Sequence, residues 1–178
     1  YKFINNWISQ MLSKGRNETA FVIFGEIGDG KSSVFEYLKR WIIGEQYCLT
    51  DSNINNVFGN FNSTRARKML VVLEEAKDTK DNFIKTCGMI KDAITNSSFM
   101  CVKKGKEAVE ETNYNNFVFL TNNKVPVQIE DKDRRYNVFR SSNCYQSNAE
   151  YFDSIHSIMD NQEYANKLLT YYCWCARF

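Results

Sequence analysis

The chain has 178 residues, a length that suits one domain. Hydrophobic residues make up 43% and charged residues 25%, which excludes a disordered tail, and a single proline excludes collagen-like and proline-rich proteins. Lys and Arg number 23 against 21 Asp and Glu, so the net charge of +2 excludes a histone-like polycation but allows a local basic patch.

A membrane span and a zinc site are not expected. The longest apolar runs are strand-sized and fall short of the roughly 18 residues that a membrane helix needs. The six cysteines include no Cys-x-x-Cys pair, and the one histidine, His156, lies far from Cys173 and Cys175, which indicates free thiols in a reducing compartment. Because the chain starts at Tyr1 and not at an initiator methionine, we expect it to be cut from a longer protein.

The first third of the chain predicts two helices separated by a strand and a glycine loop. Apolar residues at helical spacing predict an amphipathic helix over residues 2–13. Residues 20–24 are a continuous apolar run, typical of a buried parallel strand. After the glycine loop, residues 31–43 predict a helix, whereas the asparagine-rich residues 51–62 are expected to be irregular.

The rest of the chain alternates between strands and helices. Residues 69–73, 117–120 and 136–139 predict strands, and residues 83–94 and 149–174 predict helices. His156 falls at helical spacing within the last of these, and we interpret it as a structural residue. Strands that alternate with helices favour a parallel sheet, so the expected fold class is α/β.

A phosphate-binding loop is the most specific motif. Residues 25–32 fit G-x-x-x-x-G-K-[ST], with a buried strand before and a helix after; an ordinary glycine turn is the alternative. Glycines let backbone N–H groups face a phosphate, and the helix N-terminus adds partial positive charge. Lys31 would then reach the β- and γ-phosphates and Ser32 would hold Mg²⁺, whereas the side chain of Asp29 is expected to face away. The predicted nucleotide-contacting residues are Gly25, Glu26, Ile27, Gly28, Asp29, Gly30, Lys31, Ser32 and Ser33.

A carboxylate pair follows the second buried strand. Glu74 and Glu75 come directly after residues 69–73, and the carboxyl ends of parallel strands are where α/β sheets bind ligands. We assign Glu74 to the metal and Glu75 to the attacking water, which it would orient or deprotonate, but the sequence leaves these two roles interchangeable. A solvated acidic start to a loop is the alternative.

A polar residue also follows the third buried strand. Asn122 comes shortly after residues 117–120. Its amide both donates and accepts hydrogen bonds, so it can bridge the γ-phosphate and the attacking water. A turn-forming asparagine is the alternative.

Two arginines precede the last strand. Arg134 and Arg135 carry a fixed, charged fork that suits stabilising a transferring phosphoryl group, and such a finger can come from a neighbouring subunit. The alternative is a surface ion pair with Asp131 and Asp133.

Two strand-like runs, residues 99–103 and 108–112, predict a hairpin with a basic tip. The lysines at this tip are Lys103, Lys104 and Lys106. A charge run of this kind is a solvated turn or a contact for nucleic-acid phosphates.

In this order, these pieces resemble superfamily 3 helicases, a branch of the AAA+ ATPases, and in particular the helicase domains of phage and large-DNA-virus primase-helicases. The likeness lies in Trp7, Ile8 and residues 25–33, 69–75, 89–106, 117–122 and 133–136. The resemblance implies a three-layer α/β P-loop NTPase with a mainly parallel central sheet, a protruding β-hairpin and flanking N- and C-terminal helices. It divides the chain into an N-terminal helix over residues 1–18, an ATPase core over 19–142 and a C-terminal helical extension over 143–178, whose end we expect to be truncated.

The resemblance also implies an activity and partners. It implies an ATP-dependent DNA helicase motor of a phage or viral replication protein, which uses Mg²⁺, moves on single-stranded DNA as a ring, usually a hexamer, and works with a fused or associated primase or polymerase in the host cytoplasm. Asn122 would be the sensor asparagine, and the hairpin lysines would grip DNA. Arg135 matches the arginine finger best, with Arg134 a further candidate. Glu74 departs from the strictest form of the family, in which aspartate is also common.

A second function class remains open. A P-loop ATPase that remodels or loads a protein partner would need the same loop but no basic hairpin, so the hairpin discriminates between the two. A metabolite kinase is a poorer match, because it needs no Asp-Arg-Arg before a late strand.

Overall fold

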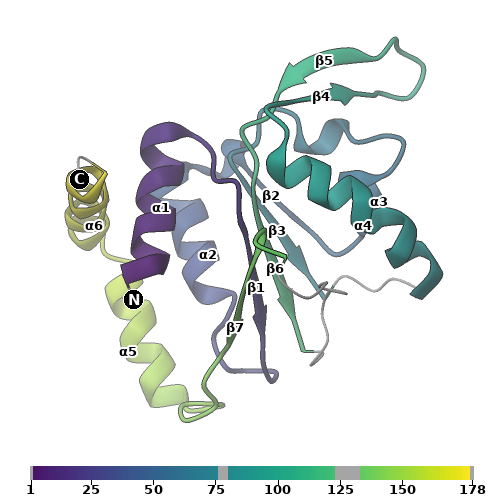
Figure 1. The fold of residues 1–178 in the computed structure, drawn as a ribbon. Coiled ribbons are helices and arrows are strands. Elements are labelled where there is room, and N and C mark those ends of the chain that lie inside the picture. The colour runs from purple at the N-terminus through teal and green to yellow at the C-terminus, as the bar shows by residue number, and fades with distance from the viewer. Residues whose placement is uncertain (1, 76–79, 123–132, 177–178) are drawn as a thin grey trace.

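The computed structural model describes residues 2–75, 80–122 and 133–176. At its centre lies a five-stranded sheet in the order β2-β3-β6-β1-β7, in which every neighbouring pair is parallel (Figure 1). The strands are β1 (Ala20–Phe24), β2 (Cys48–Asp51), β3 (Leu70–Glu74), β6 (Asn116–Thr121) and β7 (Tyr136–Arg140). The predicted α/β class with a mainly parallel sheet is confirmed.

Helices cover both faces of the sheet (Figure 1). On one side lie α1 (Lys2–Lys14), α2 (Ser33–Tyr37) with its π-helical continuation η1 (Leu38–Ile43), α5 (Ala149–Met159) and α6 (Gln162–Cys175). On the other lie α3 (Ile54–Phe58) and α4 (Lys80–Thr95). Two short 3₁₀ turns, η2 (Glu45–Tyr47) and η3 (Ser63–Arg65), precede β2 and β3. In the described part of the chain, no helix is both long and apolar enough to cross a membrane.

Each face of the sheet has its own hydrophobic core, because side chains alternate along a strand. Along β1, Ala20 and Val22 join the core beneath α3 and α4, whereas Phe21 joins the core beneath α1 and α2. Trp7 of α1 stacks on Phe21 with 4.4 Å between ring centroids, and its indole N–H donates to the carbonyl of Thr19 at 2.9 Å. The continuous apolar runs predicted as buried strands are therefore buried on both faces.

The structure differs from the predicted elements at several places. The strand β2 was not predicted, because only Cys48 of its four residues is buried and it lies at the edge of the sheet. Residues 51–62, expected to be irregular, contain α3, in which Ile54, Val57 and Phe58 are buried at helical spacing. The helix expected over residues 149–174 is two helices. The side chain of Asn161 accepts from the backbone N–H of Glu163 at 2.8 Å and so caps the second.

The predicted hairpin is present, with shorter strands than expected. Strands β4 (Ser98–Cys101) and β5 (Val109–Thr112) are antiparallel and form a separate two-stranded sheet. In chain order they follow α4 and precede β6. Residues 102–108 connect them, and Gly105 there has φ +73°, a left-handed conformation that glycine adopts readily. The hairpin extends from the end of the domain where β6 begins (Figure 1).

Candidate functional site

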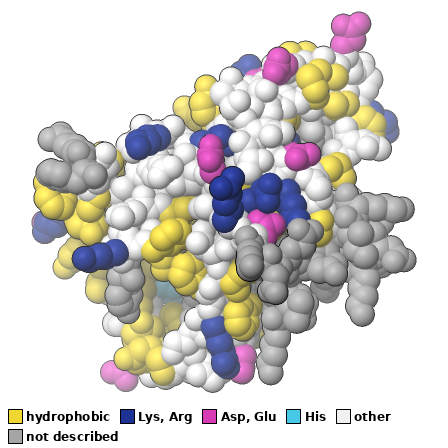
Figure 2. Space-filling model, in the orientation of Figure 1, with side chains coloured by type: hydrophobic (Ala, Val, Ile, Leu, Met, Phe, Trp, Pro, Cys, Tyr) yellow, Lys and Arg dark blue, Asp and Glu magenta, His cyan; other side chains and the backbone are white. Residues whose placement is uncertain are grey.

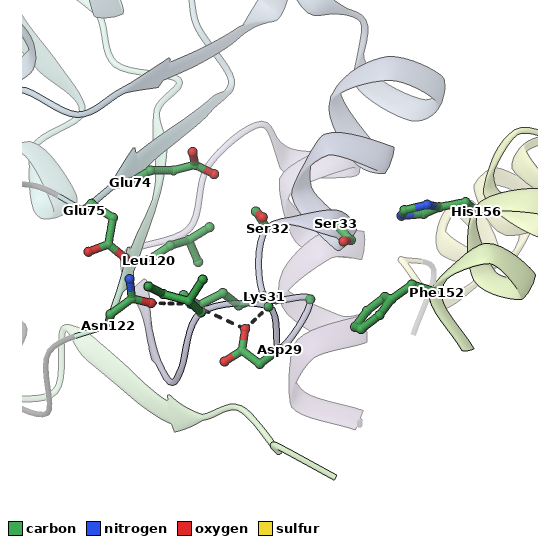
Figure 3. A pocket seen from close by; sticks show the side chains of 13 residues that line it. Asp29, Lys31, Ser32, Ser33, Glu74, Glu75, Leu120, Asn122, Phe152 and His156 are labelled. Atoms are coloured by element: carbon green, nitrogen blue, oxygen red, sulfur yellow. Dashed lines mark hydrogen bonds and ion pairs between the residues drawn. The ribbon is translucent and has the colours of Figure 1, made fainter. Parts of the chain in front are cut away.

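The glycine loop lies at the carboxyl end of β1 and borders a cleft of about 410 Å³. Gly28 and Gly30 both have φ +81°, so the loop turns twice through conformations that a larger side chain would strain. The cleft is lined by Ile27, Gly28, Asp29, Gly30, Lys31, Ser32, Ser33, Glu74, Glu75, Leu120, Asn122, Phe152 and His156 (Figure 3). The fold thus brings the loop, the carboxylate pair and the predicted asparagine together at one edge of the sheet. Of the remaining predicted loop residues, Gly25 and Glu26 line a second hollow beside Asn122.

Lys31 connects the loop to the end of β6. Its Nζ donates to Oδ1 of Asn122 at 2.7 Å and to the carbonyl of Glu26 at 2.9 Å. The same Nζ lies 3.4 Å from Oδ1 of Asp29, and only 11% of the lysine side chain is exposed. The ammonium group therefore occupies the middle of the cleft with oxygen partners on both sides.

Asp29 faces the backbone N–H and the ammonium group of Lys31, which are the donors assigned to phosphate, so the prediction that it faces away from the phosphates is wrong. Its Oδ1 accepts from the backbone N–H of Lys31 at 3.1 Å, and its other oxygen accepts from the hydroxyl of Ser141. The side chain is 1% exposed, because Ser141, which directly follows β7, closes over it. The carboxylate thus bonds to a backbone N–H and to the ammonium, two donors that a phosphate would otherwise use.

The carboxylate pair lies across the cleft from the loop (Figure 3). Glu74 is the last residue of β3, and Glu75 follows it with φ +48°. A non-glycine residue in this region is uncommon, and strained backbone of this kind concentrates at functional sites. The N–H of Glu75 donates to the carbonyl of Leu120 at 2.9 Å, so β6 holds the strained turn in place.

Two residues of α5 complete the cleft, and the sequence did not predict them. Figure 3 shows Phe152 and His156 on the side opposite the carboxylates, with Ser32 between the two groups. A Cβ added to Gly30 would lie 2.6 Å from the ring of Phe152, so a glycine is required there for the helix to pack this closely. His156 is exposed and lines the cleft, so its interpretation as a structural residue stays a prediction. No spacing in the sequence relates these residues to the loop, since only the tertiary packing of α5 brings them there.

The two arginines lie away from the cleft. They precede β7, at the amino edge of the sheet, where the carbonyl of Arg135 accepts from the N–H of Ala20 at 2.7 Å. The guanidinium of Arg135 lies 3.2 Å from Asp133, which is 1% exposed and also lies 3.4 Å from Lys91. Burial alone would raise the pKa of Asp133, but the hydrogen bonds and charge of Arg135, with Lys91, lower it overall. Arg134 is exposed, and Asp131 lies outside the described residues.

The three hairpin lysines are exposed. The N–H of Lys106 donates to the carbonyl of Lys103 at 3.1 Å and closes the turn around Gly105. Figure 2 shows basic and acidic side chains distributed together over the visible face, with a group of basic ones near its middle. This face is not uniformly basic, so any nucleic-acid contact there would depend on a local group of cations.

Residues 23–135, more than half of the chain, match the sequence model of a family described as a family of unknown function, DUF5906. The chain belongs to this family. The matched segment of the DUF5906 chain holds the glycine loop from Gly25 onward, both carboxylates, Asn122, the hairpin and both arginines, whereas Phe152 and His156 lie beyond it.

The DUF5906 chain is also similar to a phage replication protein. It is 29% identical over 161 residues to the DNA primase-polymerase of Nitratiruptor phage NrS-1. The aligned residues make up 89% of this chain but 22% of the phage protein. The chain therefore spans about a fifth of this relative's length. A solved apo structure of the NrS-1 C-terminal region matches with a TM-score of 0.76 and 25% identity, over 94% of this chain and 40% of that one. A second apo structure of the region matches with a TM-score of 0.74 and 24% identity, over 99% and 40%.

A viral helicase shares the fold. The JCV helicase, solved with a small molecule bound, matches with a TM-score of 0.57 and 14% identity, over 93% of this chain and 50% of that one. At this identity the likeness concerns the fold alone. The DUF5906 chain is thus related in sequence to a phage replication protein and has a helicase-like fold.

Proposed function

We propose that the chain is the ATP-hydrolysing motor domain of a phage or viral replication protein, of the superfamily 3 helicase type within the AAA+ ATPases. The observation that carries this proposal is the single cleft that holds the glycine loop, Lys31, the carboxylate pair and Asn122 at the carboxyl edge of a parallel sheet. A loop of this type binds phosphates through backbone N–H groups, and the opposite carboxylates supply the residues that hydrolysis requires.

The residues present fit a magnesium–nucleotide substrate. The Ser32 hydroxyl and the Glu74 carboxylate are hard oxygen donors that line the same cleft, and such donors suit Mg²⁺. When bound, Mg²⁺ would neutralise charge that develops on the β- and γ-phosphates. Phe152 and His156, on the opposite side, would border the rest of the nucleotide.

The chain's own residues then divide the chemistry. Lys31 would exchange its contacts with Asp29 and Asn122 for phosphate oxygens, which frees the Asn122 amide to hold the attacking water. Glu75 would accept a proton from that water as it attacks the γ-phosphorus, and ADP would leave with the γ-phosphoryl group transferred to water.

The arginines fit a role between subunits. Arg134 and Arg135 lie at the amino edge of the sheet, whereas the cleft lies at its carboxyl edge. In a ring, each cleft would therefore receive an arginine from the neighbouring copy. A hexameric ring is the assembly that we propose. The Arg135–Asp133 ion pair leaves the exposed Arg134 more accessible to a neighbouring subunit.

The hairpin fits a contact with single-stranded DNA. Its three exposed lysines surround one turn and can neutralise backbone phosphates. The relative named a DNA primase-polymerase supports a replication role, with a primase or polymerase as the fused or associated partner.

The rate of ATP hydrolysis with and without single-stranded DNA tests this function. We expect hydrolysis that single-stranded DNA stimulates severalfold. Hydrolysis that DNA leaves unchanged, but that a protein partner stimulates, would instead support a remodelling ATPase. Absence of hydrolysis under both conditions would refute the proposal.

A further inference from the structure

One loop that leads into the central sheet also contacts the hairpin through its side chains. Residues 62–68, which we term the clamp loop, directly precede Met69 and β3, and they contact the hairpin at three positions. Asn62 contacts the backbone of β4, Arg65 lies on the ring of Phe99, and Arg67 lies 3.8 Å from Glu111 of β5. These contacts are separate from the covalent attachments of the hairpin to α4 and β6.

Asn62 pairs with the outer edge of the hairpin. Its Nδ2 donates to the carbonyl of Met100 at 3.0 Å, and its Oδ1 accepts from the N–H of Val102 at 3.0 Å. One carboxamide therefore bonds the backbone on the edge of β4 that β5 leaves open, as a residue of a third strand would. This contact lies at the end of β4 that is farther from α4, the helix from which the chain enters the hairpin.

Arg65 supports the same strand from within the protein. Its guanidinium lies 3.8 Å from the ring centroid of Phe99, and its Nη1 donates to Oδ1 of Asn115 at 3.1 Å. Only 5% of the residue is exposed. Burial lowers the pKa of Arg65 to about 10, so it remains a cation at neutral pH and keeps its attraction to the aromatic face.

The clamp loop is fixed in turn to β6. The Nδ2 of Asn115, the residue before β6, donates to the carbonyls of Arg65 at 2.8 Å and Lys68 at 2.7 Å. The loop thus continues into β3, which ends at Glu74, and is bonded to the start of β6, which leads to Asn122. The two strands that lead to the carboxylate pair and to Asn122 therefore begin next to the clamp loop.

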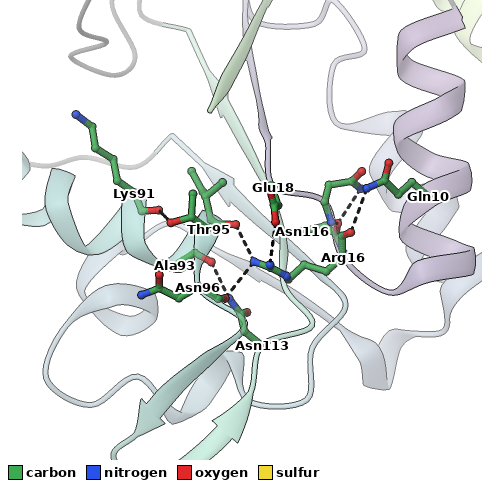
Figure 4. Close-up of polar contacts among 11 residues, drawn as sticks. Gln10, Arg16, Glu18, Lys91, Ala93, Thr95, Asn96, Asn113 and Asn116 are labelled. Atoms are coloured by element: carbon green, nitrogen blue, oxygen red, sulfur yellow. Dashed lines mark hydrogen bonds and ion pairs between the residues drawn. The ribbon is translucent and has the colours of Figure 1, made fainter. Parts of the chain in front are cut away.

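The root of the hairpin is held independently at the end of α4 (Figure 4). Nη1 of Arg16 donates to the carbonyls of Ile94 and Asn96, both at 3.0 Å. Nδ2 of Asn113 donates to the carbonyls of Ala93 and Asn96, both at 2.7 Å. These bonds satisfy carbonyl groups that a helix end leaves without partners, so the root stays in place without Asn62.

We propose that Asn62 is a positioning residue that sets the direction of the hairpin relative to β3 and β6. This inference rests on the proposed function, because the orientation matters only if the hairpin contacts DNA and the cleft hydrolyses ATP. A shift of β3 or β6 on nucleotide binding would reach the hairpin through the clamp loop and the two hydrogen bonds of Asn62.

The variant Asn62→Ala tests this role. Asn60→Ala is the matched control, because Asn60 is an exposed asparagine two residues before Asn62, and its side chain forms no hydrogen bond within the described residues. We expect amide hydrogen exchange at Val102 to accelerate by roughly tenfold in Asn62→Ala, since its acceptor is lost. We expect basal hydrolysis within about twofold of the unaltered protein but a DNA-stimulated increment reduced by at least roughly threefold. The control should match the unaltered protein in all three measurements.

The outcomes separate the two proposals. Unchanged hydrogen exchange at Val102 would show that the hydrogen bonds of Asn62 do not hold this part of the hairpin. Faster exchange with undiminished DNA stimulation would overturn the positioning role of Asn62. A loss of basal hydrolysis in parallel with stimulation would show a general structural role and would also overturn it. If the unaltered protein hydrolyses no ATP, the proposed function fails, and the proposed role of Asn62 in DNA stimulation fails with it. The exchange rate at Val102 still shows whether Asn62 holds the hairpin.

Discussion

At the scale of single residues, Lys31 and Asp29 form an internal ion pair in the loop where a phosphate would bind. The Asp29 carboxylate bonds both to the backbone N–H and to the ammonium of Lys31, and Ser141 keeps it there. The Asp29 carboxylate already lies within hydrogen-bond distance of these two donors. A phosphate bound to the same donors would therefore lie next to this negative charge. Like charges at such distances repel by several kcal/mol in a partly buried site, so we expect Asp29 to oppose the nucleotide binding that we propose.

The variant Asp29→Asn removes this opposition with little change in shape. We expect it to bind ATP at least roughly fivefold more tightly, equivalent to about 1 kcal/mol, as measured by equilibrium titration. Asp153→Asn, which removes an exposed carboxylate of α5, should leave the affinity unchanged. Weaker binding by Asp29→Asn would mean that the carboxylate holds the loop in its binding conformation and does not compete with phosphate.

Glu75 provides a second test at this scale. The variant Glu75→Gln is nearly isosteric but cannot accept a proton, so we expect ATP binding within about threefold of the unaltered protein and kcat lower by roughly 10²–10⁴. Single-turnover kinetics and nucleotide titration measure the two effects separately. If Glu74→Gln gives this pattern and Glu75→Gln weakens binding, the two roles are interchanged.

At the scale of elements, the strands were predictable where both faces of the sheet are covered. Parallel strands buried on two sides require unbroken apolar runs, and residues 20–24, 69–73 and 117–120 show them. The edge strand β2 lacks such a run, because only Cys48 is buried. For the same reason, the site residues that follow the predicted strands could be predicted, whereas Phe152 could not, since the packing of α5 on Gly30 depends on tertiary structure alone.

The helix after the glycine loop shows a further limit of periodicity. Residues 31–43 were predicted as one helix, but α2 begins at Ser33 and the chain is π-helical from Leu38 to Ile43. The widened turns still bury Leu38 in the core beneath α1. An apolar pattern that suits an α-helix does not distinguish a π-helical segment, because the two differ by one residue in the hydrogen-bond spacing.

The hairpin carries the test of DNA contact. Replacing Lys103, Lys104 and Lys106 by alanine should weaken single-stranded DNA binding and reduce the slope of log K against log salt by about 2, since each lost phosphate contact accounts for about 0.7. Basal hydrolysis should persist, and its stimulation by DNA should disappear. A control that replaces the exposed Lys2, Lys14 and Lys167 makes the same change in charge elsewhere. An unchanged affinity and slope in the hairpin variant would identify it as a solvated turn.

At the scale of the whole molecule, the cleft and the arginines lie at opposite edges of one sheet. This separation predicts that an arginine completes the cleft of another subunit. We expect Arg134→Ala or Arg135→Ala to bind ATP normally and to lose roughly 10³–10⁵ in turnover, and Arg134, which is exposed, is the better candidate.

Mixing variants tests action between subunits. The inactive arginine variant and Lys31→Ala should recover part of the activity when combined, because some interfaces then join an intact loop to an intact arginine. The mixed assembly is first verified by mass spectrometry. If no mixing ratio restores activity in a verified mixed oligomer, the arginine does not act across the interface.

The central claim is that this cleft hydrolyses ATP, and the most direct test is the hydrolysis rate of the unaltered protein beside that of Lys31→Ala. Lys31 has oxygen partners on both sides of the cleft, and no other described lysine lines it. We predict magnesium-dependent hydrolysis by the unaltered protein, and no hydrolysis with greatly weakened ATP binding in Lys31→Ala. Equal rates in the two proteins, or no hydrolysis by either, would contradict the account.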